Sequence, residues 1–560
     1  MAAEPLPSLL EVDLDSSRRG LRSRLSEDLG GEPVLRRTVE GVLACQRVAA
    51  PLLVVPRIQE EAARQLVRDL PVQWFSHEFP DIAVRARLRR GRLWGKEGWR
   101  GGIGDAFFAG EAGNPAAFVA AYERQGWHAA IHIPAEAALV DPQALDEIAS
   151  VFLDERQGAP VYLSTAPPGI AGDIVALPLL KQFRELGCSF EKVFPFLPDR
   201  PEHDAEIRRA FHHFSEEITG FRGRFTVDSS STLELVRVLW ERLQGNAERI
   251  SSVRLFEFLR DHPDVWAGPT PEELLVEVGG DQGGVRPARH AALGSLTQAS
   301  RTEGSPGSLN GGSSTGGTIF TGGTIPEAVW GRVCESFAQR EDGLLTLGGG
   351  YHDPLLDLSL EERIGRARRA GALGIHVQTS PANVDKPRAE SLLDSGLEVI
   401  SVALGSPGRE SIPGLESLLE ARDQLQDPPF VLVSVFLEET TTGNLEAFFD
   451  RWFARVDRIL VRGADGPRGE VIPETLGVFA PPRRFSCARL TSQMRIEWDG
   501  RVPLCDRDPD PVASAGSLAE SSVAEIWHGP RFREAREVHR RGEWDGYFHC
   551  GPCTSWFRFD

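Results

Sequence analysis

Long apolar runs are absent from this chain, which has no stretch near the roughly 18 residues that a membrane-spanning helix needs. Positive charge is scarce relative to acid, because 62 basic residues face 81 acidic ones and the net charge is −19. This balance argues against nucleic acid and anionic membranes as primary partners, and leaves an unidentified protein or small molecule. No basic segment precedes an apolar one near Met1, so we expect no secretory signal and a cytoplasmic location.

Cysteine is also sparse, and most of the chain contains very little of it. Cys45, Cys188 and Cys334 lie far apart without ligand spacing, so we expect them to be reduced, buried thiols. The remaining four cysteines are close to the C-terminus. That concentration makes the C-terminal region the first candidate for a metal site.

The four C-terminal cysteines form two pairs. The stretch from Cys487 to Cys505 is typical of a strand, a turn at 499–500 and a short strand, and such a hairpin would bring these two thiols together. Cys550 and Cys553 form a C-x-x-C that supplies the other half of the site. Four thiolates bind either zinc or an iron–sulfur cluster, and ligand spacing alone does not choose between them.

The pattern C-x12-G-x4-C, formed by Cys487, Gly500 and Cys505, is followed by SLAESSVAEIWHGPRFREAREVHRRG and a C-x-x-C. It resembles the SPASM domain, the C-terminal auxiliary-cluster module of many radical S-adenosylmethionine (SAM) enzymes. The resemblance implies a helix near 522–532 and one 4Fe-4S cluster bound by the four cysteines. The alternatives are a zinc site and a degenerate site that binds nothing.

The length of 560 residues predicts two or three domains. A stretch rich in Gly, Ser and Thr at 289–325 predicts a flexible insertion. We expect an N-terminal domain at 1–250, a central domain at 251–480 that contains this insertion, and a small cysteine-rich module at 481–560.

The central domain alternates short β-rich apolar runs with helical stretches, which predicts an α/β fold with a parallel sheet. Ligands bind such sheets at the carboxyl ends of the strands. The expected strands lie at 344–350, 374–380, 398–404, 430–437 and 457–463.

TLGGGYHDPLLDLSLEERIGRARRAG, at 346–371, resembles the GGxGEPLLHP segment of the radical SAM partial barrel. Residues 378–380 and the strand at 398–404 match further segments of that family. The resemblance implies a weak, degenerate SAM site. Without it, the glycines are typical of a tight strand-to-helix turn. The residues of the implied site are Gly348, Gly349, Gly350, Asp353 and Ser401.

Radical SAM enzymes carry C-x3-C-x2-C on the loop after the first strand, and here the candidate first strand is 274–278. No cysteine lies between Cys188 and Cys334. Without three thiolates there is no iron open to the cofactor and no 5′-deoxyadenosyl radical. We therefore expect SAM to be absent, or bound without cleavage.

Residues 16–45 resemble the opening loop of cytidylyltransferases, on a nucleotide-diphospho-sugar transferase fold. Arg24 and Leu25 match its Arg-Leu-Pro-x-Lys segment, but Ser-Glu-Asp follows, so an acid replaces the activating lysine. Glu136 and Asp228 lie where the resemblance implies the Mg²⁺ ligands of a degenerate nucleotide site. Residues of this kind are also common in turns and helix caps.

Together the three parts resemble the spiro-SPASM family. The resemblance implies an iron–sulfur protein whose two enzyme-derived domains have lost catalytic groups, with a role in binding, electron transfer or regulation near glycan or nucleotide-sugar metabolism. One alternative is an active enzyme that uses SAM or CTP. The other is a zinc-stabilised scaffold.

Overall fold

The structure is a computed structural model, and the two compact units of the chain are described separately. One unit contains Met1–Gly268, Pro481–Ala488 and Phe557–Asp560, and the other contains Pro269–Ala480 and Arg489–Trp556. Where the sequence predicted a separate module from 481, Arg489–Trp556 thus forms one unit with the central domain. The structure describes residues 4–79, 86, 89–90, 93–94, 114–186, 211–219, 224–244, 250–262, 265, 268, 270–279, 323–338, 340, 342–348, 352–404, 411–437, 445–463, 484, 486–487, 489–505, 514–548, 550–553 and 556.

Three predicted features lie wholly or largely outside the described residues. They are Cys188, the pair Gly349 and Gly350, and most of the insertion at 289–325. Within the described parts of the chain, none of the helices combines the length and the apolar character that crossing a membrane requires.

The N-terminal unit is built on a mixed seven-stranded sheet of order β5-β4-β1-β6-β8-β7-β9, in which β8 runs antiparallel to β6 and β7. Two short antiparallel strands of two residues each, β2 (Asp28–Leu29) and β3 (Glu32–Pro33), precede the first helix. The strands of the sheet are β1 (Ser8–Glu11), β4 (Leu52–Pro56), β5 (Gln73–His77), β6 (Ala129–His132), β7 (Val161–Ser164), β8 (Asp173–Ala176) and β9 (Phe211–His212).

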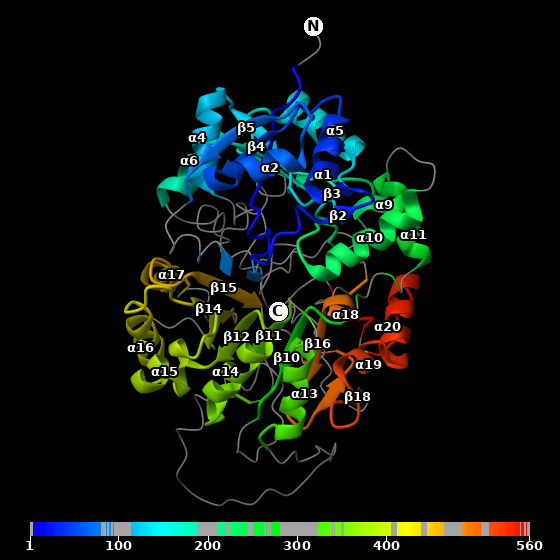
Figure 1. Cartoon of the computed structure of the whole chain (residues 1–560). Helices are drawn as coiled ribbons and strands as arrows, with labels where there is room; N and C mark the ends of the chain where they lie inside the picture. The colour runs from blue at the N-terminus through cyan, green and yellow to red at the C-terminus, as the bar shows by residue number, and fades with distance from the viewer. Residues whose placement is uncertain are drawn as a thin grey trace, which may run out of the picture. The chain divides into compact units, whose positions relative to one another are not determined.

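Alternating strand residues bury the two faces of this sheet in two separate apolar cores. Leu9 and Ala130 pack with α4 and α6 on one face, whereas Leu10 and Ile131 pack with α1, α5, α10 and α11 on the other. The unit is therefore a three-layer α/β/α structure (Figure 1). Its helices are α1 (Val34–Leu43), α2 (Glu60–Leu66), α4 (Pro115–Gln125), α5 (Pro142–Val151), α6 (Leu177–Leu186), α9 (Glu216–Thr219), α10 (Ser230–Gln244) and α11 (Ser252–Asp261).

The second unit contains a seven-stranded sheet in which all neighbours are parallel, in the order β15-β14-β13-β12-β11-β10-β16. The predicted parallel α/β sheet is therefore confirmed. Its helices include α13 (Glu327–Ala338), α14 (Leu360–Ala370), α15 (Lys386–Asp394), α16 (Pro413–Arg422) and α17 (Leu445–Trp452). The strands are β10 (Glu273–Val276), β11 (Leu344–Leu347), β12 (Gly374–Thr379), β13 (Val399–Leu404), β14 (Phe430–Leu437), β15 (Arg458–Gly463) and β16 (Gln493–Ile496).

The edge strand β16 differs from the prediction. The sequence indicated a hairpin from Cys487 to Cys505, but β16 pairs in parallel with β10, and Figure 1 shows it in orange beside the green β10. The expected turn is present, because the Gly500 amide donates to the Glu497 carbonyl (2.9 Å) and Gly500 has a φ of 88°. After the turn, β17 (Arg501–Pro503) pairs with β18 (Ser514–Ser517) instead of with β16.

The C-terminal part of this unit continues with two helices where the resemblance implied one. Helix α19 (Val523–Trp527) begins with a capping box in which Ser522 and Glu525 bond reciprocally, and α20 (Pro530–Arg541) follows Gly529. The Arg536 guanidinium donates to the carbonyls of Leu490 (2.8 Å) and Trp527 (2.9 Å). Arg536 thereby ties α20 to α19 and to the short helix α18 (Arg489–Ser492) that leads into β16.

One face of the parallel sheet carries a chain of hydrogen bonds across five strands. The Glu273 carboxylate accepts from Gln493 Nε2 (2.7 Å) and from Thr346 Oγ1 (2.6 Å). His376 Nδ1 lies 3.3 Å from Thr346 Oγ1, and His376 Nε2 lies 2.7 Å from Ser401 Oγ. Because the Thr346 hydroxyl proton goes to Glu273, Nδ1 of His376 is the donor to Thr346, and Nε2 accepts from Ser401. All five residues are buried, so the chain joins β16 to the centre of the sheet.

This chain predicts the effect of removing one hydroxyl. Thr346→Val removes a hydrogen bond from Glu273 and another from His376 at nearly constant volume, so we expect the free energy of unfolding to fall by about 2–3 kcal/mol. Thr346→Ser keeps the hydroxyl and is the matched control. Chemical denaturation of both variants checks the prediction, and equal stability of the Val and Ser variants would contradict it.

Candidate functional site

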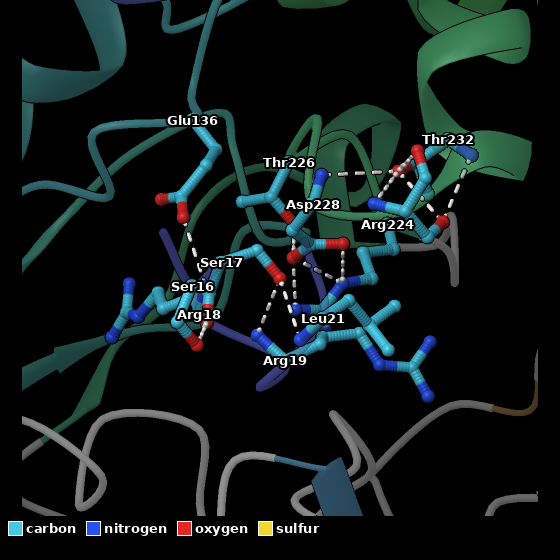
Figure 2. Close-up of polar contacts among 11 residues, drawn as sticks. Ser16, Ser17, Arg18, Arg19, Leu21, Glu136, Arg224, Thr226, Asp228 and Thr232 are labelled. Atoms are coloured by element: carbon cyan, nitrogen blue, oxygen red, sulfur yellow. Dashed lines mark hydrogen bonds and ion pairs between the residues drawn. The ribbon is translucent and has the colours of Figure 1, made fainter. Parts of the chain in front are cut away.

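The loop after β1 is held in one conformation by its own hydrogen bonds. The Ser17 amide donates to the Leu21 carbonyl (2.7 Å), the Gly20 amide donates to the Ser17 carbonyl (2.8 Å), and Gly20 has a φ of 70°. This closed turn directs the Arg18 amide at Glu136 Oε1, at a distance of 2.9 Å (Figure 2). The loop and the predicted Mg²⁺ ligand Glu136 therefore lie together.

Glu136 is buried beyond the end of β6. Its carbonyl accepts from the Val227 amide (2.9 Å), which places it beside the segment that carries Asp228. Burial, followed by the negative charge of Asp228, raises the pKa of the Glu136 carboxyl to about 7, against the opposing effect of Arg18. The structure thus brings together the two acids that the resemblance paired.

Asp228 is fully buried and is engaged by its own segment. Arg224 Nε lies 2.9 Å from Oδ2 and 3.1 Å from Oδ1, Arg224 Nη2 forms an ion pair with Oδ2, and Thr226 Oγ1 donates to Oδ2 (2.7 Å). The neighbouring Ser229 and Thr232 exchange hydrogen bonds at the start of α10, as in a helix cap. The sequence allowed Asp228 to be a helix-cap residue, but the hydrogen bonds at the start of α10 are made by Ser229 and Thr232.

This arrangement does not fit a bound Mg²⁺ ion. Both oxygens of Asp228 accept hydrogen bonds from Arg224, and Glu136 holds the Arg18 amide. Mg²⁺ requires several free oxygen ligands in nearly octahedral geometry. In the described part of the chain, no three His, Cys, Asp or Glu side chains form a group that could hold a metal ion.

The strand ends of the second unit bring together two segments that the radical SAM resemblance singled out. The Asp353 carboxylate accepts from Thr379 Oγ1 (2.8 Å), the Ser380 amide (2.7 Å) and Asn383 Nδ2 (2.9 Å). It also accepts from the Leu355 amide (2.9 Å). The acid that would bind an amino group of SAM is thus surrounded by donors from the end of β12.

The other two described members of this implied site have structural partners. Gly348 has a φ of 107°, and a Cβ there would lie 2.6 Å from the Gln378 carbonyl oxygen. Glycine is therefore required at 348 by its left-handed backbone conformation and by the close approach of the Gln378 carbonyl. Ser401 lies within β13 and is bonded to His376.

Sequence reasoning missed a buried charged cluster at the carboxyl ends of β10, β11 and β16. Glu277 Oε1 accepts from the His352 amide (3.1 Å) and lies 3.0 Å from His352 Nδ1. Arg495 Nη2 lies 3.6 Å from Glu277 Oε2, and Arg495 Nε donates to Glu497 Oε1 (2.9 Å). Charged residues an even number of positions apart in ELLVEV (four) and in QMRIEW (two) were the available signal, because even spacing places them on one face of the sheet.

Within this cluster the pKa of the Glu277 carboxyl is lowered and the pKa of the Glu497 carboxyl is raised. Burial alone would raise the pKa of Glu277, but hydrogen bonds from His352 and Glu497 and the charge of Arg495 outweigh it and lower that pKa below the usual range. Burial raises the pKa of Glu497, and the adjacent Glu277 adds to the increase. Glu277 is therefore the ionised member of the pair.

The four C-terminal cysteines are all described and all half-buried. The Cys553 amide donates to the Cys550 carbonyl (3.3 Å) and the Cys550 amide donates to the Tyr547 carbonyl (3.0 Å), so the C-x-x-C occupies one turn. Cys505 follows β17 in the same unit, whereas Cys487 belongs to the segment grouped with the N-terminal unit. Four thiol donors suit an iron–sulfur cluster or zinc chemically, but no three of them are grouped as metal ligands among the described residues.

The pKa of Glu136 has a consequence for stability. Because the folded state holds this proton up to about pH 7, the free energy of unfolding should fall as the pH rises from about 4.5 to 7, by on the order of 3 kcal/mol. Glu136→Gln should remove this part of the fall. Denaturation across that pH range checks it, with the exposed Glu185→Gln as control, and identical profiles for Glu136→Gln and the unaltered chain would refute it.

Comparison with known proteins gives one family match and several distant similarities. Residues 487–554 match the SPASM family model, described as an iron-sulfur cluster-binding domain. An uncharacterized protein of Treponema pallidum (strain Nichols) is 27% identical over 135 residues, which are 24% of this chain and 36% of that protein. The match therefore spans about a third of that relative's length.

Solved structures with similarity to the chain include a cytidylyltransferase from Leptospira borgpetersenii serovar Hardjo-bovis (strain JB197), with 14% identity and a TM-score of 0.35 over 47% of this chain and 97% of that one. BtrN in complex with AdoMet and 2-DOIA has 13% identity and a TM-score of 0.33, over 50% and 92%. Native anSMEcpe with bound AdoMet has 10% identity and a TM-score of 0.34, over 50% and 88%. The resemblance seen in the cysteine pattern is confirmed by the family model, which matches residues 487–554.

Proposed function

We propose that this chain is an iron–sulfur protein in which Cys487, Cys505, Cys550 and Cys553 hold one 4Fe-4S cluster. The extent of the family match carries the proposal, because it begins at Cys487 and ends one residue after Cys553. A cluster with four thiolate ligands stores and passes single electrons and has no open coordination position. The function that follows is binding, electron transfer or regulation.

The half-buried state of the four thiols supports this ligand set. Partial burial limits access of water and oxidants while leaving each sulfur able to reach a metal. Zinc would suit the same donors, and the description of the SPASM family favours iron and sulfide over zinc. Metal analysis separates the two.

We also propose that the central sheet does not cleave SAM. The sequence has no cysteine between Cys188 and Cys334, so the loop after β10 supplies no thiolate for an open iron. The carboxyl end of β10 instead carries Glu277, which is bonded to His352. The donors around Asp353 further support a barrel that binds SAM weakly or not at all.

The N-terminal unit is, in this proposal, a non-catalytic relative of the cytidylyltransferases. Arg24 Nη1 lies 3.4 Å from Glu27 Oε1, so the arginine that would meet phosphate faces an acid of its own chain. A place near nucleotide-sugar or glycan metabolism follows from the resemblance of this unit. The acidic net charge supports a protein or small-molecule partner over nucleic acid or membrane, and reduced thiols suit the cytoplasm.

The proposal predicts the metal content of protein purified without oxygen. We expect about four irons and four sulfides per chain, measured by elemental and sulfide analysis. Cys550→Ala should release the cluster and make the C-terminal region sensitive to protease, because ligand binding and local folding are coupled. Cys334→Ala, which alters a half-buried thiol on α13, is the matched control. Stoichiometric zinc without iron would refute the proposal, as would full iron content in the Cys550→Ala variant.

A further inference from the structure

Two buried carboxyls in the N-terminal unit require compensating positive charge. Glu136 is 4% exposed and Asp228 is 0% exposed, and the Glu136 carbonyl accepts from the Val227 amide beside Asp228. Two carboxylates held close together in a low-dielectric interior repel each other unless a cation or a proton intervenes. In a metal-dependent site that charge comes from a divalent ion.

Arg224 supplies the charge here. Its Nε contacts both oxygens of Asp228, at 2.9 and 3.1 Å, and its Nη2 adds an ion pair with Oδ2. Two-point contact between a guanidinium and a carboxylate is among the strongest and most directional ion pairs in proteins. The side chain of Arg224 is 12% exposed, so water competes little for this contact.

The remaining ligand positions around Asp228 and Glu136 are also filled from the chain. Thr226 Oγ1 donates to Asp228 Oδ2 (2.7 Å), and the Arg18 amide donates to Glu136 Oε1 (2.9 Å). A divalent ion would have to displace Arg224 from the first carboxylate and the Arg18 amide from the second. The ion pair is also local, because Arg224 is four residues before Asp228.

We propose that Arg224 takes the place of a divalent cation, so that the N-terminal site is metal-independent and the charge of Asp228 is balanced by a fixed guanidinium. The inference goes beyond the proposed function, since it concerns the other unit and holds whether the cysteines bind iron, zinc or nothing. It also has a consequence for ligands. Any phosphate-containing ligand that this unit binds would do so without a divalent ion, so its affinity is unchanged by a chelator.

The test uses the full-length chain and Mn²⁺, whose paramagnetic resonance signal reports the bound ion. The unaltered chain and Arg224→Lys should show no Mn²⁺ binding that depends on Glu136. Arg224→Gln removes the positive charge at similar length, so it should gain one Mn²⁺ per chain, bound at least about tenfold more tightly than by the unaltered chain. The double variant Arg224→Gln with Asp228→Asn should lose that gain.

Two outcomes would overturn the inference. One is stoichiometric Mn²⁺ binding by the unaltered chain that Glu136→Gln abolishes, and this measurement does not require any Arg224 variant to fold. The other is a folded Arg224→Gln variant, verified by circular dichroism, that gains no Mn²⁺. Iron and sulfide content should be measured on the same samples. A sample without iron contradicts the proposed cluster but leaves the Mn²⁺ result, and so the inference about Arg224, unaffected.

Discussion

Buried charges in this protein are paired with groups of the same chain. Asp228 is paired with Arg224, and Asp353 is surrounded by donors from the end of β12. Glu277 is likewise held by His352 and by Arg495. A buried carboxylate must have a partner, whether a ligand or the protein supplies it. For these carboxylates, in both units, the protein itself supplies the partner.

The same pairing joins the C-terminal SPASM region to the parallel sheet. Strand β16 lies beside β10, and the contacts of Gln493 with Glu273 and of Arg495 with Glu277 fix its register. Helix α18 precedes this strand, and Arg536 ties α18 to α19 and α20. The carboxyl end of β10 is therefore connected, through β16 and α18, to the helices that precede the C-x-x-C.

Much of the second unit could be predicted from its sequence, because the apolar runs of parallel strands and the helices between them have distinct periods. Strand β14 matches its predicted run at 430–437, and the turn at Gly500 is where Asp-Gly indicated. The chain reverses after β16 as predicted, with the Glu497 amide donating to the Arg501 carbonyl (2.8 Å). The parallel pairing of β16 with β10 was not predicted, since four residues before a tight turn do not reveal a second partner that is distant in sequence. Its register depends on Glu273, more than 200 residues away.

The sites were harder to predict than the strands. The sequence resemblance identified Glu136 and Asp228, and the two do lie together. It did not identify Arg224, because this residue precedes the matched motif and is not part of it. Glu277 was missed for a related reason, since charge in a strand is usually assigned to the solvent face. Only the three-dimensional arrangement shows that these charges satisfy one another. The cysteine set rests on spacing and on the family match.

The central proposal is that the cluster of this chain is fully ligated by cysteine, so that SAM, whether absent or bound without cleavage, does not bind an iron. Mössbauer spectroscopy of protein loaded with ⁵⁷Fe, recorded with and without SAM, tests both parts in one measurement. The account predicts a 4Fe-4S spectrum in which no iron is distinct and which SAM leaves unchanged. A distinct iron whose signal shifts when SAM is added would contradict it.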